Sequence, residues 1–391
     1  MFAVFSTPRK VALYFMALVS LLVLSACDTL PGGGGPTINT NAPVPVALLV
    51  PRSSAQSGDS VLAQSLENAA RLAIADLGGT VQIDLRVYDT GGNASTAAAQ
   101  ATQAVNDGAR IILGPVYAES ANAVGLAVRG QNVNVLSFSN NASIAGGNVF
   151  VLGPTFDNSA ERLTQFAARQ GKRSIVLVHG TDLSGQLGAA AIQRAISGSS
   201  ARLAGTVAYD LSQQAVIGAV PRIKSAVESS GADSIFLTST TAGALPLFTQ
   251  LLPESGVSPA TTQYIGLTRW DIPSQTLALP GAQGGWFALP DPSRSQQFVS
   301  RYSAAYGAAP HPIGGLAYDG IAAIGALVGA GKSDALTGAA LTQGAGFQGV
   351  NGIFRLRPDG TNQRGLAVAT IQNKQVVVID PAPTSFSGAG F

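Results

Sequence analysis

The sequence predicts an α/β protein with two lobes, each built on a parallel sheet covered by helices. Short apolar runs alternate with longer helical patterns along most of the chain, and this alternation occurs in two successive series. Strands separated by helices form βαβ units, in which neighbouring strands are parallel. The length of 391 residues gives room for two or three compact domains.

The first series begins after residue 45. The run 46–50 is continuously apolar, as in a buried strand, whereas 81–87 alternates apolar and polar residues, as in a half-buried strand. Between them, Leu62 and Leu66 fall on one helical face, and Gly78 follows as a stop signal. The series comprises strands at 46–50, 81–87, 111–113 and 133–137, and helices at 59–77, 97–107 and 120–129.

The second series has the same character and ends in a predicted hairpin. Pro358-Asp359-Gly360 is a turn signal between apolar runs at 353–356 and 367–379. The other expected strands are 174–179, 204–209, 234–238, 263–266 and 285–289, and the helices are 158–170, 187–196, 216–229, 245–252, 296–306 and 315–328.

Charge and composition exclude several classes of function. The formal net charge is only +2, without the clustered basic excess of a nucleic-acid-binding protein. One cysteine excludes a disulfide framework and a zinc site built from CxxC pairs. With two histidines there is little material for a metal site, and no GxSxG motif exists for a hydrolase. We therefore expect no catalytic residues, no metal and no cofactor.

The N-terminus carries an export signal. Arg9 and Lys10 precede an apolar run of signal-peptide length that ends in Leu24-Ser25-Ala26-Cys27. This ending resembles the bacterial lipobox, which implies that residues 1–26 are cleaved and that Cys27 is lipidated. Two or three acyl chains give a stable membrane anchor. The Gly- and Pro-rich segment 27–45 is expected to be a flexible tether, and the choice between inner and outer membrane stays open.

Several short motifs, taken in order, resemble the type 1 periplasmic-binding-protein fold of the leucine/isoleucine/valine-binding proteins. They are Val50-Pro51 before a Ser/Gly loop, Tyr88-Asp89-Thr90, Ile111-Ile112-Leu113-Gly114-Pro115, Val135-Leu136-Ser137-Phe138-Ser139-Asn140 and Ala317-Tyr318-Asp319-Gly320. The resemblance covers essentially residues 46–380. It implies two Rossmann-like lobes with parallel central sheets, joined by a three-stranded hinge.

The resemblance also implies the domain boundaries. Residues 46–154 and 285–331 would form one lobe, residues 155–284 and 332–380 the other, and residues 381–391 a C-terminal tail. Ligands of open α/β sheets lie beyond the carboxyl ends of the strands. The loops at those ends supply the candidate cleft residues Ser53, Ser54, Ser57, Ser137 and His179.

The family's amino-acid site is matched only in part. Ser139 and Asn141 occupy two carboxylate-binding positions, but Ala118 stands where the family has a serine, and Ser120 lies two residues further on. The acid that holds the ligand ammonium corresponds to Thr268, with Asp271 nearby but not aligned. A zwitterion would then be poorly paired, so the resemblance argues against a simple amino acid as ligand.

Aromatic residues near these loops complete the candidates. Tyr117 and Phe138 flank the cleft positions and could stack on a ligand. Trp270, between Arg269 and Asp271, could line the cleft or a partner surface, or could pack at a lobe edge, while Trp286 is expected in the core. His179 is either a ligand contact or an ordinary polar residue at a strand end.

Two functions fit these observations. The lipobox and the altered amino-acid site resemble the penicillin-binding protein activators, lipoproteins that stimulate a bifunctional penicillin-binding protein by contact, although the helical-repeat domain of the enteric activator has no counterpart here. The alternative is the solute receptor of an ABC importer, with an ABC permease as partner and an amino acid or related small polar ligand. The sequence puts the activator first.

Overall fold

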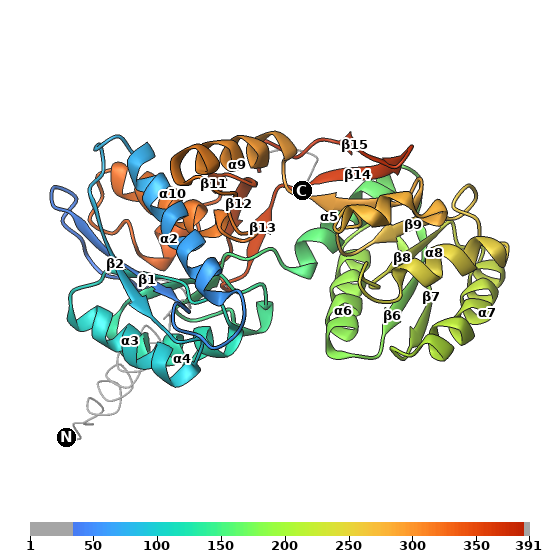
Figure 1. The fold of residues 1–391 in the computed structure, drawn as a ribbon, viewed down its shortest axis with the longest axis horizontal. Coiled ribbons are helices and arrows are strands. Elements are labelled where there is room, and N and C mark those ends of the chain that lie inside the picture. The colour runs from blue at the N-terminus through green and yellow to red at the C-terminus, as the bar shows by residue number, and fades with distance from the viewer. Residues whose placement is uncertain (1–33, 387–391) are drawn as a thin grey trace, which may run out of the picture.

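Two lobes lie side by side in the computed structural model, which describes residues 34–386 (Figure 1). The proposed signal peptide and Cys27 lie outside the described residues. Among the described helices, none combines the length and the apolar composition needed to cross a membrane.

The first lobe is built on a five-stranded sheet in the order β2-β1-β3-β4-β5, with all neighbours parallel. Val46, Leu48 and Val50 of β1 contact the core on one face of the sheet, and Ala47 and Leu49 contact the core on the other. Burial on both faces explains why the run is continuously apolar. The strands are β1 (Val44–Val50), β2 (Ile83–Asp89), β3 (Ile111–Leu113), β4 (Asn134–Ser137) and β5 (Val149–Val151).

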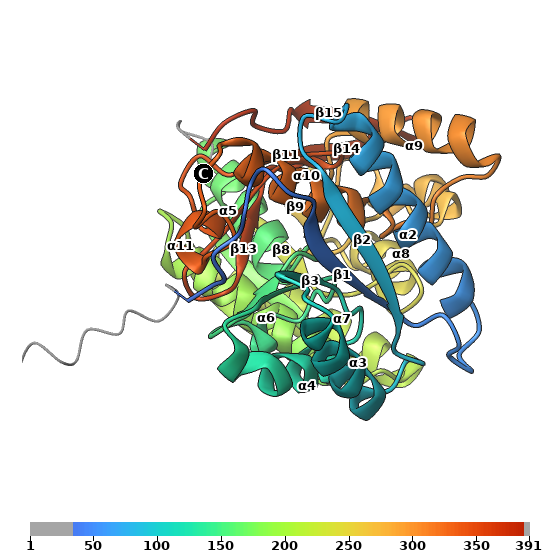
Figure 2. The same ribbon diagram turned by 90° about the vertical axis from the view of Figure 1, so that its left-hand side faces the viewer.

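Helices cover both faces of this sheet (Figure 2). On one face lie α2 (Asp59–Asp76), α9 (Pro292–Tyr306) and α10 (Gly315–Gly329). On the other face lie α3 (Ala94–Asn106) and α4 (Ala118–Val128). Short 3-10 turns η1 (Arg129–Gln131) and η2 (Ala142–Ile144) flank β4.

The second lobe contains a seven-stranded sheet in the order β15-β14-β10-β9-β8-β6-β7. The strands are β6 (Ser174–Gly180), β7 (Arg202–Tyr209), β8 (Ser234–Leu237), β9 (Gln263–Gly266), β10 (Trp286–Leu289), β14 (Ala367–Gln372) and β15 (Gln375–Asp380). Strands β6 to β10 are parallel, whereas β14 runs antiparallel to β10 and β15. One face is covered by α5 (Phe156–Arg169) and α6 (Leu183–Ser197), the other by α7 (Gln213–Ser230) and α8 (Leu245–Glu254). Two 3-10 turns, η3 (Ser274–Ala278) and η4 (Pro280–Ala282), precede β10.

The α/β class with parallel sheets in two lobes is confirmed, but the lobe boundaries differ from those expected. Strand β10 falls within residues 285–331, which the family resemblance places in the first lobe, yet it lies between β9 and β14 in the second sheet. The resemblance places residues 332–364 in the second lobe, yet Leu336, Phe354 and Leu356 pack in the core of the first. Neither change could be read from local periodicity, because β-pairing and core membership are non-local.

A third, small sheet explains why residues 332–364 join the first lobe. It consists of β11 (Phe347–Gly349), β12 (Gly352–Leu356) and β13 (Asn362–Arg364) in the order β11-β12-β13, preceded by α11 (Gly338–Leu341). The Pro358-Asp359-Gly360 turn joins β12 to β13, not to the terminal strands. The terminal hairpin is β14–β15, whose turn residues Asn373 and Lys374 have positive φ angles.

Three short segments connect the lobes. The first is Leu152–Thr155, between β5 and α5; the second is Pro290–Asp291, between β10 and α9; and the third is Gly365–Leu366, between β13 and β14. Strand β13, which leads into the third segment, is bonded to the start of the first, because Asn362 Nδ2 donates to the carbonyls of Val151 in β5 and Gly153 in the first segment at 2.8 Å each.

The segment expected to be a flexible tether is attached to the first lobe from Gly34 onward. Asn132 Nδ2 donates to Gly35 O at 2.7 Å, and Asn134 Nδ2 donates to Gly34 O at 3.1 Å. The Ile38 side chain is buried in the lobe core. Hydrogen bonds and burial therefore hold residues 34–38 in place.

Candidate functional site

The space between the lobes contains two neighbouring pockets that share Thr155 and Phe156 of the first connecting segment and α5. One pocket has a volume of about 390 Å³, and we call it the hinge pocket. The other, of about 500 Å³, is the rim pocket. Both are lined by residues from the two lobes, so a molecule bound in either would contact both.

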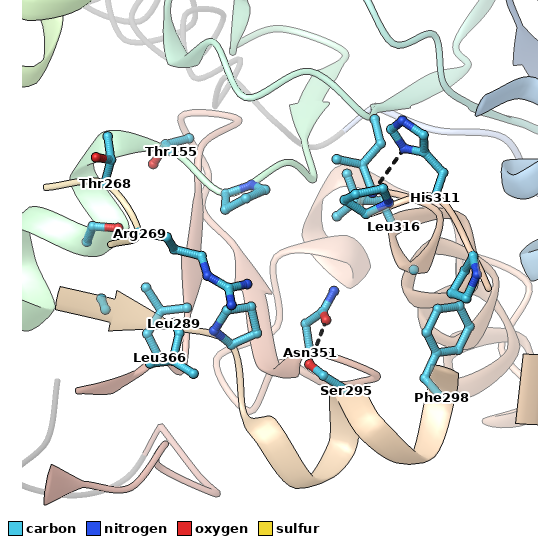
Figure 3. Close-up of a pocket in the computed structure, with 18 of the residues that line it drawn as sticks. Thr155, Thr268, Arg269, Leu289, Ser295, Phe298, His311, Leu316, Asn351 and Leu366 are labelled. Atoms are coloured by element: carbon cyan, nitrogen blue, oxygen red, sulfur yellow. Dashed lines mark hydrogen bonds between the residues drawn. The ribbon is translucent and has the colours of Figure 1, made fainter. Parts of the chain in front are cut away.

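All three connecting segments line the hinge pocket. Pro154 comes from the first, Pro290 from the second and Leu366 from the third. In Figure 3, Thr268, Arg269 and Leu289 lie on one side of the pocket, and Phe298, His311 and Leu316 lie on the other. Closure of the lobes would change the distances across this pocket, which is the geometry needed to couple ligand binding to hinge movement.

Polar side chains of the hinge pocket are held by neighbours. Ser295 Oγ donates to Asn351 Oδ1 at 3.0 Å, and Arg269 Nε donates to Asp271 Oδ1 at 2.9 Å. The Thr268 hydroxyl lies 3.5 Å from Ser239 O. Thr268, the residue expected to replace the family's ammonium-binding acid, thus lines the pocket and brings no charge to it.

His311 lies in the loop before α10. Its backbone N–H donates to Ser65 Oγ at 2.8 Å, which ties this loop to α2. Burial lowers the pKa of His311 below its ordinary value. The imidazole is therefore neutral at pH 7 and lines the pocket as a polar, uncharged ring.

The rim pocket joins the loop after β4 to the start of α6. Asn141 lines it from the first lobe, and Leu183 and Leu187 line it from the second. Both leucines are exposed, Leu183 by 72%. Arg194 and Asp157, 2.8 Å apart, form an ion pair beside them. Of the cleft candidates drawn from the sequence, Asn141 lines this pocket, Thr268 lines the hinge pocket, and the others line neither.

The serines after β4 form successive side-chain turns. Ser137 Oγ donates to Pro115 O at 3.0 Å and accepts from Ser139 N at 3.1 Å. Ser139 Oγ accepts from Asn141 N, and Asn141 Oδ1 accepts from Ser143 N. These hydroxyls therefore shape the loop in this structure, and Ser137 is fully buried.

Tyr117 contacts a carboxylate of its own lobe. Its hydroxyl donates to Asp59 Oδ1 at 2.5 Å, which connects the start of α4 to the start of α2. Burial, followed by this hydrogen bond, raises the pKa of Tyr117 to about 12. The second oxygen, Asp59 Oδ2, is buried without a hydrogen-bond partner. The hydroxyl of Tyr117 thus donates its hydrogen bond to Asp59 within the first lobe.

The loop after β1 lies against β2. Ser53 N donates to Asp89 Oδ1 at 3.1 Å, and Ser54 Oγ accepts from Gln56 N. Ser57 is exposed. At the next strand end, Ala118 is the first residue of α4 and is half-buried, and Ser120 is buried.

Two aromatic candidates belong to the core. Phe138 is 2% exposed and packs in the core of the first lobe, so it does not stack on a ligand in this structure. Trp270 is completely buried, and its ring lies against Gly266 and Gly285, where any Cβ would overlap it. The interpretation of Trp270 as an exposed binding anchor is therefore wrong. Trp286 is half-buried and meets Phe166 edge-on, with ring centroids 4.8 Å apart.

His179 lies at the end of β6 and is half-buried. Its Nδ1 is 2.8 Å from Gly180 O, and it lines neither pocket. This contact agrees with the simpler interpretation, a polar residue at a strand end.

Sequence reasoning missed the residues of the connecting segments and of the loop before α10. Pro154, Pro290 and His311 line the hinge pocket, although no motif marks them. In the sequence, Pro310 and Pro312 on either side of His311 indicate only a loop of restricted geometry. Arg269 stands next to Trp270 in the sequence, but that it lines a pocket depends on the approach of α9 and α10.

The comparisons with known proteins agree with this architecture. The family model of the periplasmic binding proteins matches residues 43–375. No curated protein matches the chain.

Three solved structures illustrate the shared fold. A branched chain amino acid ABC transporter periplasmic ligand-binding protein from Burkholderia xenovorans is 20% identical, with a TM-score of 0.67, and the match covers 88% of this chain and 97% of that one. An ABC transporter substrate-binding protein from Desulfitobacterium hafniense in complex with Leu is 17% identical, with a TM-score of 0.61 and coverage of 86% and 100%. A solute-binding protein from R. palustris in complex with benzoate is 16% identical, with a TM-score of 0.54 and coverage of 88% and 97%.

These identities establish a common fold, and the family model establishes membership. Periplasmic binding proteins bind ligands without catalysing a reaction, and the family places the protein in the periplasm. Since the match spans most of the chain and the lobes have the expected connections, this protein belongs to the periplasmic binding protein family, with the type 1 fold of its leucine-binding members.

Proposed function

We propose that the protein is the solute receptor of an ABC importer, anchored to a membrane by acyl chains on Cys27. The observation that carries this proposal is the hinge pocket, because all three connecting segments line it. A small molecule bound there contacts both lobes and stabilises one hinge angle. An ABC permease would then distinguish the liganded receptor from the free one by its shape.

The solved relatives support this choice over the activator that the sequence put first. The relatives described above are ligand-binding proteins of ABC transporters, and two of them carry small organic ligands. The comparisons offer no support for a penicillin-binding protein as partner. The small polar ligand and the ABC permease, named as the alternative from the sequence, therefore become the main proposal.

Ligand-induced stabilisation and closure test the proposal. The full chain, purified in detergent, is mixed with each of the twenty amino acids, their amides and a set of small carboxylates. We expect at least one compound to raise the Tm by mass action and to reduce the radius of gyration in small-angle scattering. No shift in either quantity across the panel contradicts the proposal.

Two variants on one helix provide the matched control. Ser295→Trp introduces a large side chain into the hinge pocket, whereas Ser300→Trp lies on an exposed part of α9 outside it. The first should abolish the ligand-dependent shift, and the second should retain it.

Partner capture from cross-linked native envelopes distinguishes the two functions. Recovery of ABC permease subunits supports the proposal. Recovery of a bifunctional penicillin-binding protein without permease subunits contradicts it and restores the activator hypothesis.

A further inference from the structure

Among the described residues that line the hinge pocket, one carries a permanent charge, and that charge is positive. Arg269 is its only permanently charged residue, His311 is its only other titratable residue, and no Asp or Glu lines it. Among the described residues of the pocket, a ligand therefore contacts a guanidinium and a neutral imidazole but no carboxylate, because Asp271, the ion-pair partner of Arg269, lies outside the lining. Hydrogen-bond donors without a lining acceptor favour an anionic group over an ammonium group.

Arg269 keeps part of its guanidinium free for a ligand. Asp271 accepts from Nε at 2.9 Å and from Nη2 at 2.5 Å, and Asp271 itself does not line the pocket. Arginine has five N–H donors, and Nη1 makes no hydrogen bond to the described residues. The Asp271 contact thus fixes the plane of the guanidinium, and Nη1 with the second hydrogen of Nη2 remains available to a carboxylate.

Other carboxylates near the interlobe space are engaged elsewhere or lie outside the hinge pocket. Asp291 of the second connecting segment caps α9 and pairs with Arg294, and it does not line the pocket. Asp157 of the rim pocket pairs with Arg194, and Asp59 accepts from Tyr117 inside the first lobe. Asp182, at the start of α6, lines neither pocket. An ammonium group in the hinge pocket would consequently lose water without gaining a carboxylate partner.

The remaining walls are mostly apolar. In Figure 3, Leu289 and Leu366 lie on the side of Arg269, and Phe298 and Leu316 lie opposite; Ile313 also lines the pocket. A volume of about 390 Å³ is within the range of small-molecule sites. The pocket thus combines one oriented guanidinium with a surface suited to a hydrocarbon group.

We infer that the solute is a small apolar carboxylate without an ammonium group, bound in the hinge pocket with its carboxylate on Arg269. This inference rests on the proposed function and narrows its substrate class. The hydrocarbon part of the ligand contacts α9 and α10, so the same molecule bridges the two lobes.

Three probes with the same branched hydrocarbon separate the charges. The first, 4-methylpentanoate, carries only a carboxylate, and the second, 3-methylbutylamine, carries only an ammonium. The third, L-leucine, carries both groups. Affinity for the full chain in detergent is measured by calorimetry, with scattering to record closure. We expect 4-methylpentanoate to bind at least tenfold more tightly than leucine, and the amine not to bind.

Variants assign the effect to Arg269. Arg269→Gln should weaken binding of 4-methylpentanoate at least tenfold. Asp271→Asn keeps one oxygen acceptor to orient the guanidinium but removes the competing charge, so it should strengthen binding several-fold. Arg222→Gln, an exposed arginine on α7 of the same lobe, is the control and should leave the affinity unchanged.

The outcomes separate this inference from the proposed function. If leucine or the amine binds best and closes the lobes, the receptor function stands and the carboxylate inference is wrong. If Arg269→Gln and Arg222→Gln bind the acid equally well, the assignment to Arg269 is likewise wrong. If no probe binds and the wider panel produces no closure, both proposals are wrong.

Discussion

Arg364 at the end of β13 and Asp319 of α10 form a buried ion pair, with Nη1 and Oδ2 3.2 Å apart. Arg364 Nε also donates to Leu152 O at 3.1 Å, in the first connecting segment. Asp319 Oδ1 accepts from Val350 N at 2.8 Å. The pair therefore connects the first connecting segment to the helix layer of the first lobe.

Loss of one member of this pair should be strongly destabilising. Arg364→Met leaves the Asp319 carboxylate buried without its counter-charge, and such losses lower the free energy of unfolding by about 3–5 kcal/mol. Urea unfolding measures the effect. The double variant Arg364→Met/Asp319→Asn should lose less than the sum of the single variants, because the pair is coupled. Strict additivity would show that the two side chains act independently.

The Tyr117–Asp59 hydrogen bond should contribute to stability in a pH-dependent manner. Tyr117→Phe leaves both oxygens of Asp59 without a side-chain donor and should lower the free energy of unfolding by about 1–3 kcal/mol at pH 7. Because the pKa of Tyr117 is raised to about 12, its contribution is present below pH 10 and disappears as the pH rises from 10 to 12. Denaturant unfolding at pH 7 and pH 11 measures both effects. An equal difference between wild type and variant at both pH values would contradict the role of the hydroxyl proton.

His311 should make the protein less stable in mild acid. Its folded-state pKa is lowered by burial, so the unfolded chain binds the proton more readily, and the free energy of unfolding falls as the pH drops below about 6.5. His311→Gln should remove this part of the pH dependence and leave stability at pH 8 nearly unchanged. Thermal unfolding between pH 5 and 8 provides the measurement, and parallel curves for the two proteins would exclude the effect.

Asn134 should hold the N-terminal segment on the first lobe. Its Nδ2 donates to Gly34 O and, at 2.8 Å, to Leu336 O. Asn134→Ala should accelerate hydrogen exchange of the Ile38 amide, which donates to Ser333 O at 2.9 Å. Asn148→Ala is the control, because the Asn148 side chain donates to Val133 O at 3.1 Å in the same lobe and not to the N-terminal segment. Equal exchange of Ile38 in both variants would argue against this attachment.

This attachment bears on the proposed lipid anchor. Six residues, 28–33, separate Cys27 from Gly34, and an extended chain of this length spans about 20 Å. If Cys27 is lipidated, the first lobe lies close to the membrane surface. Distance measurements between a label on this lobe and labelled lipids should therefore give shorter values than for the second lobe. Equal distances would contradict that orientation.

The sequence by itself determined the α/β class, the two series of βαβ units and the loops that follow the strands. These features depend on local periodicity, as in β1, where burial on both faces requires an uninterrupted apolar run. The family resemblance, and not local periodicity, identified Thr268 and Asn141 as candidates, and both line the pockets between the lobes.

Only the tertiary structure decided which lobe each late segment joins and what lines the site. Strand β10 enters the second sheet because β9 and β14 offer it partners on both edges, and β11 to β13 return to the first lobe because Phe347 and Phe354 complete its core. Trp270 is buried because Gly266 and Gly285 leave room for its ring. Arg269 lies across the hinge pocket from His311 and Leu316. Such arrangements of distant parts of the chain depend on how the lobes pack, and the spacing of residues in the sequence does not encode that packing.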